Sequence, residues 1–200
     1  SYKNNKIIRG LSRGDGEYGE DITENLLTIK DIPQILHGES IDKEFEIRGE
    51  VYIGKKDFEK IKDDFANPRN AVAGIIKRKD GNVQGIKFLA YDFIGSEFNL
   101  FSDKIDALKA LGFEIPFYTV FNGIDHLQAG YDHILNIKDS LDYELDGVVY
   151  RVNDNQAYEN AGYTSHHPKG AIAYKFQGEF GTTKLLNVEF TNISIFVKKK

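Results

Sequence analysis

Cysteine is absent from the 200-residue chain, which excludes disulfide bonds, thiolate zinc sites and a cysteine nucleophile. Apolar stretches are short, because no run approaches the roughly 18 residues that a membrane-spanning helix needs. The first five residues, Ser1 to Asn5, carry no apolar core and do not resemble a signal peptide. We therefore expect no membrane span, and a reducing, cytoplasmic setting fits a chain without cysteine.

An excess of positive charge is also missing, since 26 Lys and Arg stand against 31 Asp and Glu, for a net charge of -5. Proteins that bind nucleic acids usually show a basic footprint. The balance therefore argues against bulk phosphate binding, although it leaves room for a local basic cleft. The sequence has no repeat, low-complexity block or Pro/Gly-rich linker. We interpret the basic residues 198–200 as a solvated tail.

What the sequence does contain is a mixture of strand and helix patterns. From Phe45 to Ile53, apolar residues and Gly49 alternate with mostly polar ones, which predicts a half-buried strand. Ser102 is typical of a helix N-cap, and Gly112 of the residue that stops a helix. The expected strands cover residues 6–11, 45–53, 86–94, 115–121, 145–152, 171–176 and 185–197, and the expected helices cover 57–65, 102–111 and 124–140. This irregular order favours an α+β fold with largely antiparallel sheets.

Two segments place a glycine beside a charged side chain. In Arg13-Gly14-Asp15-Gly16 the glycines free the backbone to approach a ligand, and the arginine can meet a phosphate. A tight turn is the plainer interpretation of this segment alone. In Arg48-Gly49-Glu50, Glu50 falls on the polar face of the expected strand, where a carboxylate can accept from both hydroxyls of a ribose. A solvent-facing carboxylate is the alternative.

Residues 65–74, with the sequence FANPRNAVAG, form the most specific local signal. Pro68 suits the first turn of a helix and Asn67 suits its N-cap. Arg69 then lies near the positive end of that helix, where anions collect.

Two further segments combine a strand pattern with a charged residue. Asp146 opens a β-branched strand and can hold a metal ion, while Arg151 at its end can reach a phosphate. A hairpin with an Asp-Gly turn would explain the same residues. Lys175 lies on the expected strand from Ala171 to Phe176; if it points inward it needs a partner such as a phosphate, and otherwise it points to water.

Taken in order, these segments resemble the nucleotidyltransferase (adenylation) domain of bacterial-type NAD-dependent DNA ligases. The resemblance implies a fold of two packed, mostly antiparallel sheets with flanking helices. It assigns residues 1–186 to an adenylation domain lacking its N-terminal part, and residues 187–200 to a C-terminal strand or linker with the basic tail. The matching segments are 13–16, 19–25, 45–51, 65–74, 88–91, 111–113, 146–149, 171–176 and 182–186.

In that family a lysine in a K-x-D-G motif attacks the α-phosphorus of NAD, and the AMP then passes to a 5′-phosphate at a nick that the 3′-hydroxyl seals. The resemblance therefore implies NAD as AMP donor, Mg²⁺, and nicked double-stranded DNA as partner. The implied roles are adenine stacking for Tyr91, ribose binding for Glu50, phosphate binding for Arg13, Arg151 and Lys175, Mg²⁺ placement for Asp146, and nick binding for Arg69 and Lys77. Asp146 and Lys175 are the implied catalytic residues.

The chain departs from the family pattern at several positions. No K-x-D-G occurs, and the nearest string, Arg78-Lys79-Asp80-Gly81, has arginine in place of the nucleophile. We expect the lysine upstream of Ser1 or on a second chain, with the module that binds nicotinamide mononucleotide, so this chain alone should not adenylate itself. Arg151 stands where the family has lysine, Lys77 where arginine is usual, and Gly170 where a bulky aromatic is usual.

Three functional alternatives remain at this point. The chain is part of a ligase, either a fragment or one subunit of a split enzyme. Alternatively, it is a non-catalytic module that binds adenylate. An RNA ligase or an mRNA-capping enzyme shares the fold, but residues 65–74 favour the NAD-dependent group.

Overall fold

The computed structural model describes residues 1–14, 18–37, 43–78, 81, 83–165, 167–177 and 184, and they form a mixture of short helices and antiparallel strand pairs. The strands pair as β1 with β2, β3 with β4 and β5 with β6, each antiparallel, which confirms the expected sheet type. The strands are β1 (Tyr2–Lys3), β2 (Lys6–Ile7), β3 (Glu46–Ile53), β4 (Ile86–Ile94), β5 (Gly147–Arg151) and β6 (Ala171–Lys175). The helices are α1 (Thr23–Leu26), α2 (Lys55–Phe58), α3 (Pro68–Ile75), α4 (Phe101–Ala110), α5 (Leu127–Ile137), the 3-10 turn η1 (Lys138–Ser140) and α6 (Asn155–Ala161).

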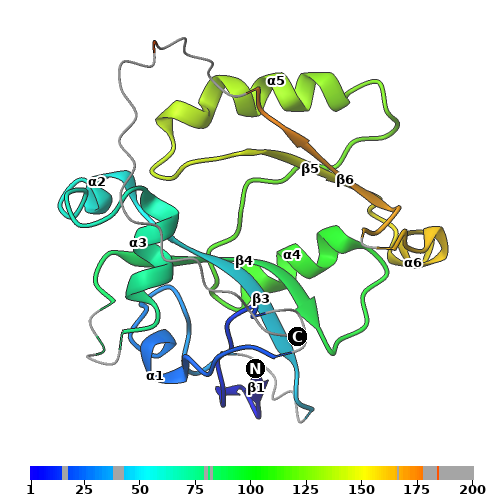
Figure 1. Ribbon diagram of the computed structural model, residues 1–200. Helices are drawn as coiled ribbons and strands as arrows, with labels where there is room; N and C mark the ends of the chain where they lie inside the picture. The colour runs from blue at the N-terminus through cyan, green and yellow to red at the C-terminus, as the bar shows by residue number, and fades with distance from the viewer. Residues whose placement is uncertain are drawn as a thin grey trace, which may run out of the picture.

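The long pair β3–β4 forms the centre of the molecule (Figure 1). The alternation predicted for β3 is confirmed, since Ile53 is buried and Ile47 and Val51 pack against the core. On β4 the buried positions change from even to odd numbers, because a β-bulge interrupts the ladder between Arg48 and Gly49. A Cβ at Gly49 would collide with the Phe88 ring and the Leu89 carbonyl oxygen, so only glycine fits at this step.

The hydrophobic core lies on the inner face of β3–β4, covered by α3 and α4. The side chains of Ile105 and Leu108 on α4 are fully buried, as is Ala71 on α3. The start of α3 follows the expected pattern: Pro68 occupies its first turn, and the Asn67 side chain accepts from the Asn70 N–H at 2.9 Å.

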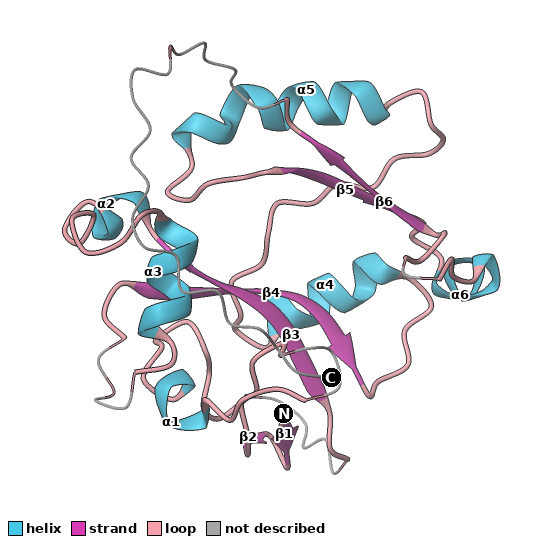
Figure 2. Cartoon of the chain, viewed as in Figure 1, coloured by secondary structure: helices cyan, strands magenta, loops and turns pink. Residues whose placement is uncertain are grey.

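The pair β5–β6 forms a second, thinner layer that lies between α5 and β3–β4 (Figure 2). Helix α5 covers one face of this layer: the Tyr150 hydroxyl donates to the Leu127 carbonyl at 2.6 Å, and the Tyr131 ring lies 4.8 Å from the Tyr174 ring. Side chains alternate along a strand. The opposite face therefore carries Gly147, Val149 and Arg151 with their partners Lys175, Ala173 and Ala171.

Several expected elements differ from the structure. The strand expected over 6–11 ends at Ile7, the helix expected over 57–65 is the short α2 followed by turns, and residues 115–121 form no regular strand. Ser102 is not the N-cap of α4; Leu100 occupies that position, and the Ser102 N–H is bound instead by the Asn153 side chain at 2.8 Å. The strand expected over 185–197 lies outside the described residues, as do residues 198–200. Within the described part of the chain, no helix has the length and apolar character to cross a membrane.

Candidate functional site

The outer face of β3–β4, turned away from the core, brings together residues that are distant in sequence. Tyr91 lies at the bulge and is 43% exposed, and Glu50 lies on the neighbouring strand opposite Leu89. Partial burial raises the pKa of Tyr91, and the nearby Glu50 carboxylate raises it further, while Arg48 and Arg13 act in the opposite direction. These effects require proximity. Tyr91, Glu50 and Arg13, predicted to stack on the base and to bind ribose and phosphate, therefore share one region.

This outer face is turned toward the second layer. Tyr52, on the same face of β3 as Glu50, lies with its ring centroid 5.1 Å from that of Tyr143. Lys87, its neighbour on β4, forms an ion pair of 2.8 Å with Asp142. Residues 142–143 lead directly into β5. Figure 2 shows the face of β5–β6 that α5 leaves free turned toward β3–β4. Glu50 on the outer face of β3–β4 and Lys175 on the free face of β5–β6 therefore belong to two surfaces that face each other.

The beginning of β5 and the end of β6 hold a second group of predicted residues. Lys175 pairs with Gly147 in the ladder, and the Phe176 N–H donates to the Asp146 carbonyl at 2.8 Å, so Lys175 and Asp146 are close neighbours along the backbone. The Asp146 carboxylate accepts a hydrogen bond from the Arg69 guanidinium on α3. The side chains of Arg69 and Asp146 are 80% and 55% exposed, so water and ligands can reach both.

Lys77 lies two residues past α3 and contacts a different part of the chain. Its ammonium forms an ion pair with Glu20 at 2.7 Å, and both side chains are largely exposed. The Glu20 N–H in turn donates to the Ser12 hydroxyl oxygen at 3.0 Å. Lys77 is thus connected to the segment that carries Arg13.

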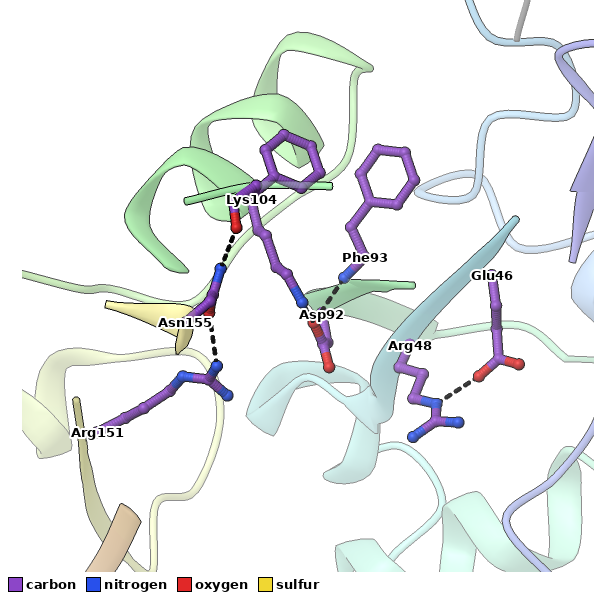
Figure 3. Close-up of polar contacts among 8 residues, drawn as sticks. Glu46, Arg48, Asp92, Phe93, Lys104, Arg151 and Asn155 are labelled. Carbon is purple, nitrogen blue, oxygen red and sulfur yellow. Dashed lines mark hydrogen bonds and ion pairs between the residues drawn. The ribbon is translucent and has the colours of Figure 1, made fainter. Parts of the chain in front are cut away.

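Arg151 does not join either group. Its guanidinium packs against two rings, with its central carbon 4.0 Å from the Phe101 ring centroid and 3.7 Å from that of Tyr158. It also donates to the Asn155 side chain at 2.8 Å (Figure 3). Its Nε is buried and has no hydrogen-bond partner within the described structure. Arg151 thus packs at the opposite end of β5 from Asp146, and its predicted role in phosphate binding stays a prediction.

The Tyr158 ring also explains the small residue at position 170. A Cβ at Gly170 would come within 2.5 Å of Tyr158 Cδ2. Beside these residues lies a polar pocket of about 410 Å³, lined by Ser96, Glu97, Phe98, Asn99, Lys104, Arg151, Asn155 and Glu159. Because both of its cationic groups are already engaged by protein partners, the pocket is not a ready anion site.

The described residues contain no cluster of three or more His, Asp or Glu side chains able to hold a metal ion. A metal ion beside Asp146 would therefore receive the one carboxylate of this residue and no ready-made cluster of further ligands from the described residues. Such a donor set suits Mg²⁺, which commonly binds through one or two carboxylates, waters and the phosphates of a substrate.

Val149 is a candidate site residue that sequence reasoning missed. Its side chain is 70% exposed on the face of β5–β6 that carries Lys175. The alternation of Gly147, Val149 and Arg151 against Val148 and Tyr150 is visible in the sequence and was the available signal.

Comparisons with known proteins identify the family of this chain. The family model for the NAD-dependent DNA ligase adenylation domain matches residues 1–179. A DNA ligase from Aquifex aeolicus (strain VF5) is 42% identical, and DNA ligases from Pelagibacter ubique (strain HTCC1062) and Wolbachia pipientis wMel are each 38% identical, over 94%, 94% and 92% of this chain. The chain belongs to the NAD-dependent DNA ligase adenylation domain family. It spans 28–29% of the length of these three relatives.

Proposed function

We propose that this protein binds the adenylate part of NAD between its two facing layers, in a nucleotidyltransferase fold, and serves a ligase that seals nicked double-stranded DNA. The proposal rests on one observation: Tyr91 and Glu50 lie close together on the β3–β4 layer, and Lys175 lies on the β5–β6 layer that faces it. An exposed aromatic ring beside a carboxylate suits a purine and its ribose, and a lysine across from them suits a phosphate.

Each residue type fits the chemistry assigned to it. The Tyr91 ring stacks on the adenine, and Glu50 accepts hydrogen bonds from the ribose hydroxyls. Lys175 donates to the α-phosphate, where negative charge builds up during transfer. Arg13 contacts phosphate from the segment next to Tyr91.

The residues at the open end of β5–β6 are proposed to handle the metal and the nick. Mg²⁺, when bound, would neutralise phosphate charge beside Asp146. Arg69 holds the same carboxylate in this structure, and its exposed guanidinium is free to move to a DNA phosphate. Lys77 offers a second cation near the end of α3.

The reaction proposed for the complete enzyme has three balanced steps. A lysine amine of the K-x-D-G motif, which these 200 residues do not contain, forms a bond to the α-phosphorus of NAD and nicotinamide mononucleotide leaves. The 5′-phosphate of the nick then takes the AMP from the lysine. The 3′-hydroxyl finally attacks that 5′-phosphate, AMP leaves and the phosphodiester is formed. Positioning and charge stabilisation are what this chain contributes.

The test is AMP and NAD binding to the Tyr91→Ala variant, measured by calorimetry. Base stacking on an aromatic side chain is worth roughly 1–3 kcal/mol, so affinity should fall about ten-fold or more. Tyr91→Phe should retain most of the affinity, because it keeps the ring. Tyr163→Ala, which removes an exposed tyrosine near β6, is the matched control. Unchanged affinity in Tyr91→Ala would remove Tyr91 from the site.

A further inference from the structure

The bulge in β4 decides which side chains reach the outer face. Gly49 pairs with Ala90 and Arg48 pairs with Asp92, so Tyr91 has no partner across the ladder. Tyr91 and Asp92 consequently both point outward, and Phe93 returns to the core, where it is buried. Strict alternation would instead place Asp92 in the core and Phe93 outside.

The Asp92 side chain holds this irregular backbone from two directions. Its Oδ1 accepts from the Phe93 N–H at 2.9 Å and from the Lys104 ammonium at 3.1 Å (Figure 3). Lys104 belongs to α4, the helix that Ile105 and Leu108 fix in the core. The ion pair therefore ties the bulge to a helix that is anchored in the core.

This pair differs from the other ion pairs among the described residues in its burial. The side chains of Lys104 and Asp92 are only 16% and 23% exposed, whereas those of Lys62 and Glu59 are 54% and 64% exposed. A partly buried carboxylate that loses its cation keeps an uncompensated charge, so removal of one partner disturbs its surroundings more than removal of a surface pair does.

We infer that Asp92 and Lys104 are positioning residues for adenylate binding: they fix the bulge and thereby hold the Tyr91 ring beside Glu50 before a ligand arrives. The inference rests on the proposed function of Tyr91. Neither residue needs to touch the ligand, because fixing a side chain in its bound position reduces the ordering that binding requires.

The experiment compares Lys104→Met, Lys104→Arg and Asp92→Asn with the unaltered protein, using AMP affinity and backbone hydrogen exchange of residues 88–94. Lys104→Met should accelerate exchange at the bulge and weaken AMP binding roughly three-fold or more, within the range of coupling between residues in contact. Asp92→Asn should act in the same direction, because it keeps an acceptor for Phe93 but loses the charge. Lys104→Arg should retain both properties. Lys62→Met, which breaks an exposed ion pair with a similar N···O distance of 2.8 Å, is the control.

A double variant separates positioning from general stability. In a Tyr91→Ala background, Lys104→Met should cause no further loss of AMP affinity, because the ring it positions is gone. If Tyr91→Ala weakens binding but Lys104→Met alters neither affinity nor exchange, the inference is overturned and the proposed function stands. If Lys104→Met speeds exchange equally in β5–β6, the lysine is a general structural residue and the inference is again wrong. If Tyr91→Ala has no effect on AMP affinity, the stacking role and the positioning role fall together.

Discussion

The two layers of this molecule differ in how deeply they are buried. All of the buried hydrophobic side chains found in the described residues lie between Tyr2 and Phe113, around β3–β4. In β6, by contrast, Ile172 is 65% exposed and Tyr174 is 51% exposed. Regions with few buried contacts open at lower free-energy cost than the core does. The proposed base and ribose sites therefore lie on the more deeply buried layer, and Lys175 and Asp146, proposed to bind phosphate and metal, lie on the layer that opens more easily.

The largest expected effect tests this difference directly. Leu108→Ala removes a side chain that is 0% exposed, and such deletions cost about 2–5 kcal/mol of unfolding free energy. Ile172→Ala on β6 should stay within about 0.5 kcal/mol, as surface substitutions usually do. Urea denaturation of both variants measures the two values. Similar losses would show that the two layers are equally important for stability.

The next prediction concerns Lys175, which is exposed on β6. In a complete ligase carrying this domain, Lys175→Ala should lower the rate of nick sealing about 10²–10³-fold, as loss of one preorganised charge donor does. The melting temperature should hardly change. Lys169→Ala, at another exposed lysine close to β6, is the control. Parallel losses of activity and melting temperature would identify Lys175 as a structural residue instead.

A smaller effect is expected from alkaline pH on the buried layer. Burial raises the pKa of Tyr2, whose hydroxyl donates to the Pro33 carbonyl at 2.6 Å. In the unfolded chain this phenol ionises near its ordinary pKa of about 10, while in the folded protein it stays protonated. Stability should therefore be complete below pH 10 and fall above it, with a contribution from Tyr2 of up to about 1.4 kcal/mol per pH unit.

The Tyr2→Phe variant isolates this contribution. Denaturation between pH 8 and pH 11 should show a shallower decline in Tyr2→Phe than in the unaltered protein, although Tyr2→Phe is less stable at pH 8 because it lacks the hydrogen bond. Identical slopes would mean that Tyr2 does not control the alkaline limit.

The smallest effect is expected at the contact between the two layers made by Arg69 and Asp146. Exposed ion pairs contribute about 0–1 kcal/mol, so Arg69→Ala should lower the unfolding free energy by less than about 1 kcal/mol. Thermal denaturation measures it. A loss well above that range would show that this contact, and not the core, joins the layers.

The sequence predicted the elements whose signals are local. The alternation of β3, the Asn67–Pro68 start of α3 and the stop at Gly112, where φ is +92°, all appear in the structure. Alternation and capping depend on neighbouring residues only, so a single sequence contains them.

Features that depend on distant partners could not be predicted in the same way. The bulge at Tyr91 requires Gly49 on another strand, and at the start of α4 the side chain of Asn153 binds the backbone N–H of Ser102, the residue that the sequence predicts as N-cap. Arg151 looked available for a phosphate because neither Phe101 nor Tyr158 is its neighbour in sequence. Residues 115–121 have strand composition but pair with no strand in the part of the chain that the structure describes, so composition alone misassigned them.

The Tyr158 ring has a consequence for how this sequence can change in evolution. The ring fills the space that a side chain at position 170 would need, and its face carries the Arg151 guanidinium. An aromatic residue at position 170 would expel Tyr158, and a lysine at position 151 would leave the ring without its planar partner. Positions 151, 158 and 170 are therefore expected to be inherited as a set, so that a lineage leaves this combination only by passing through poorly packed intermediates.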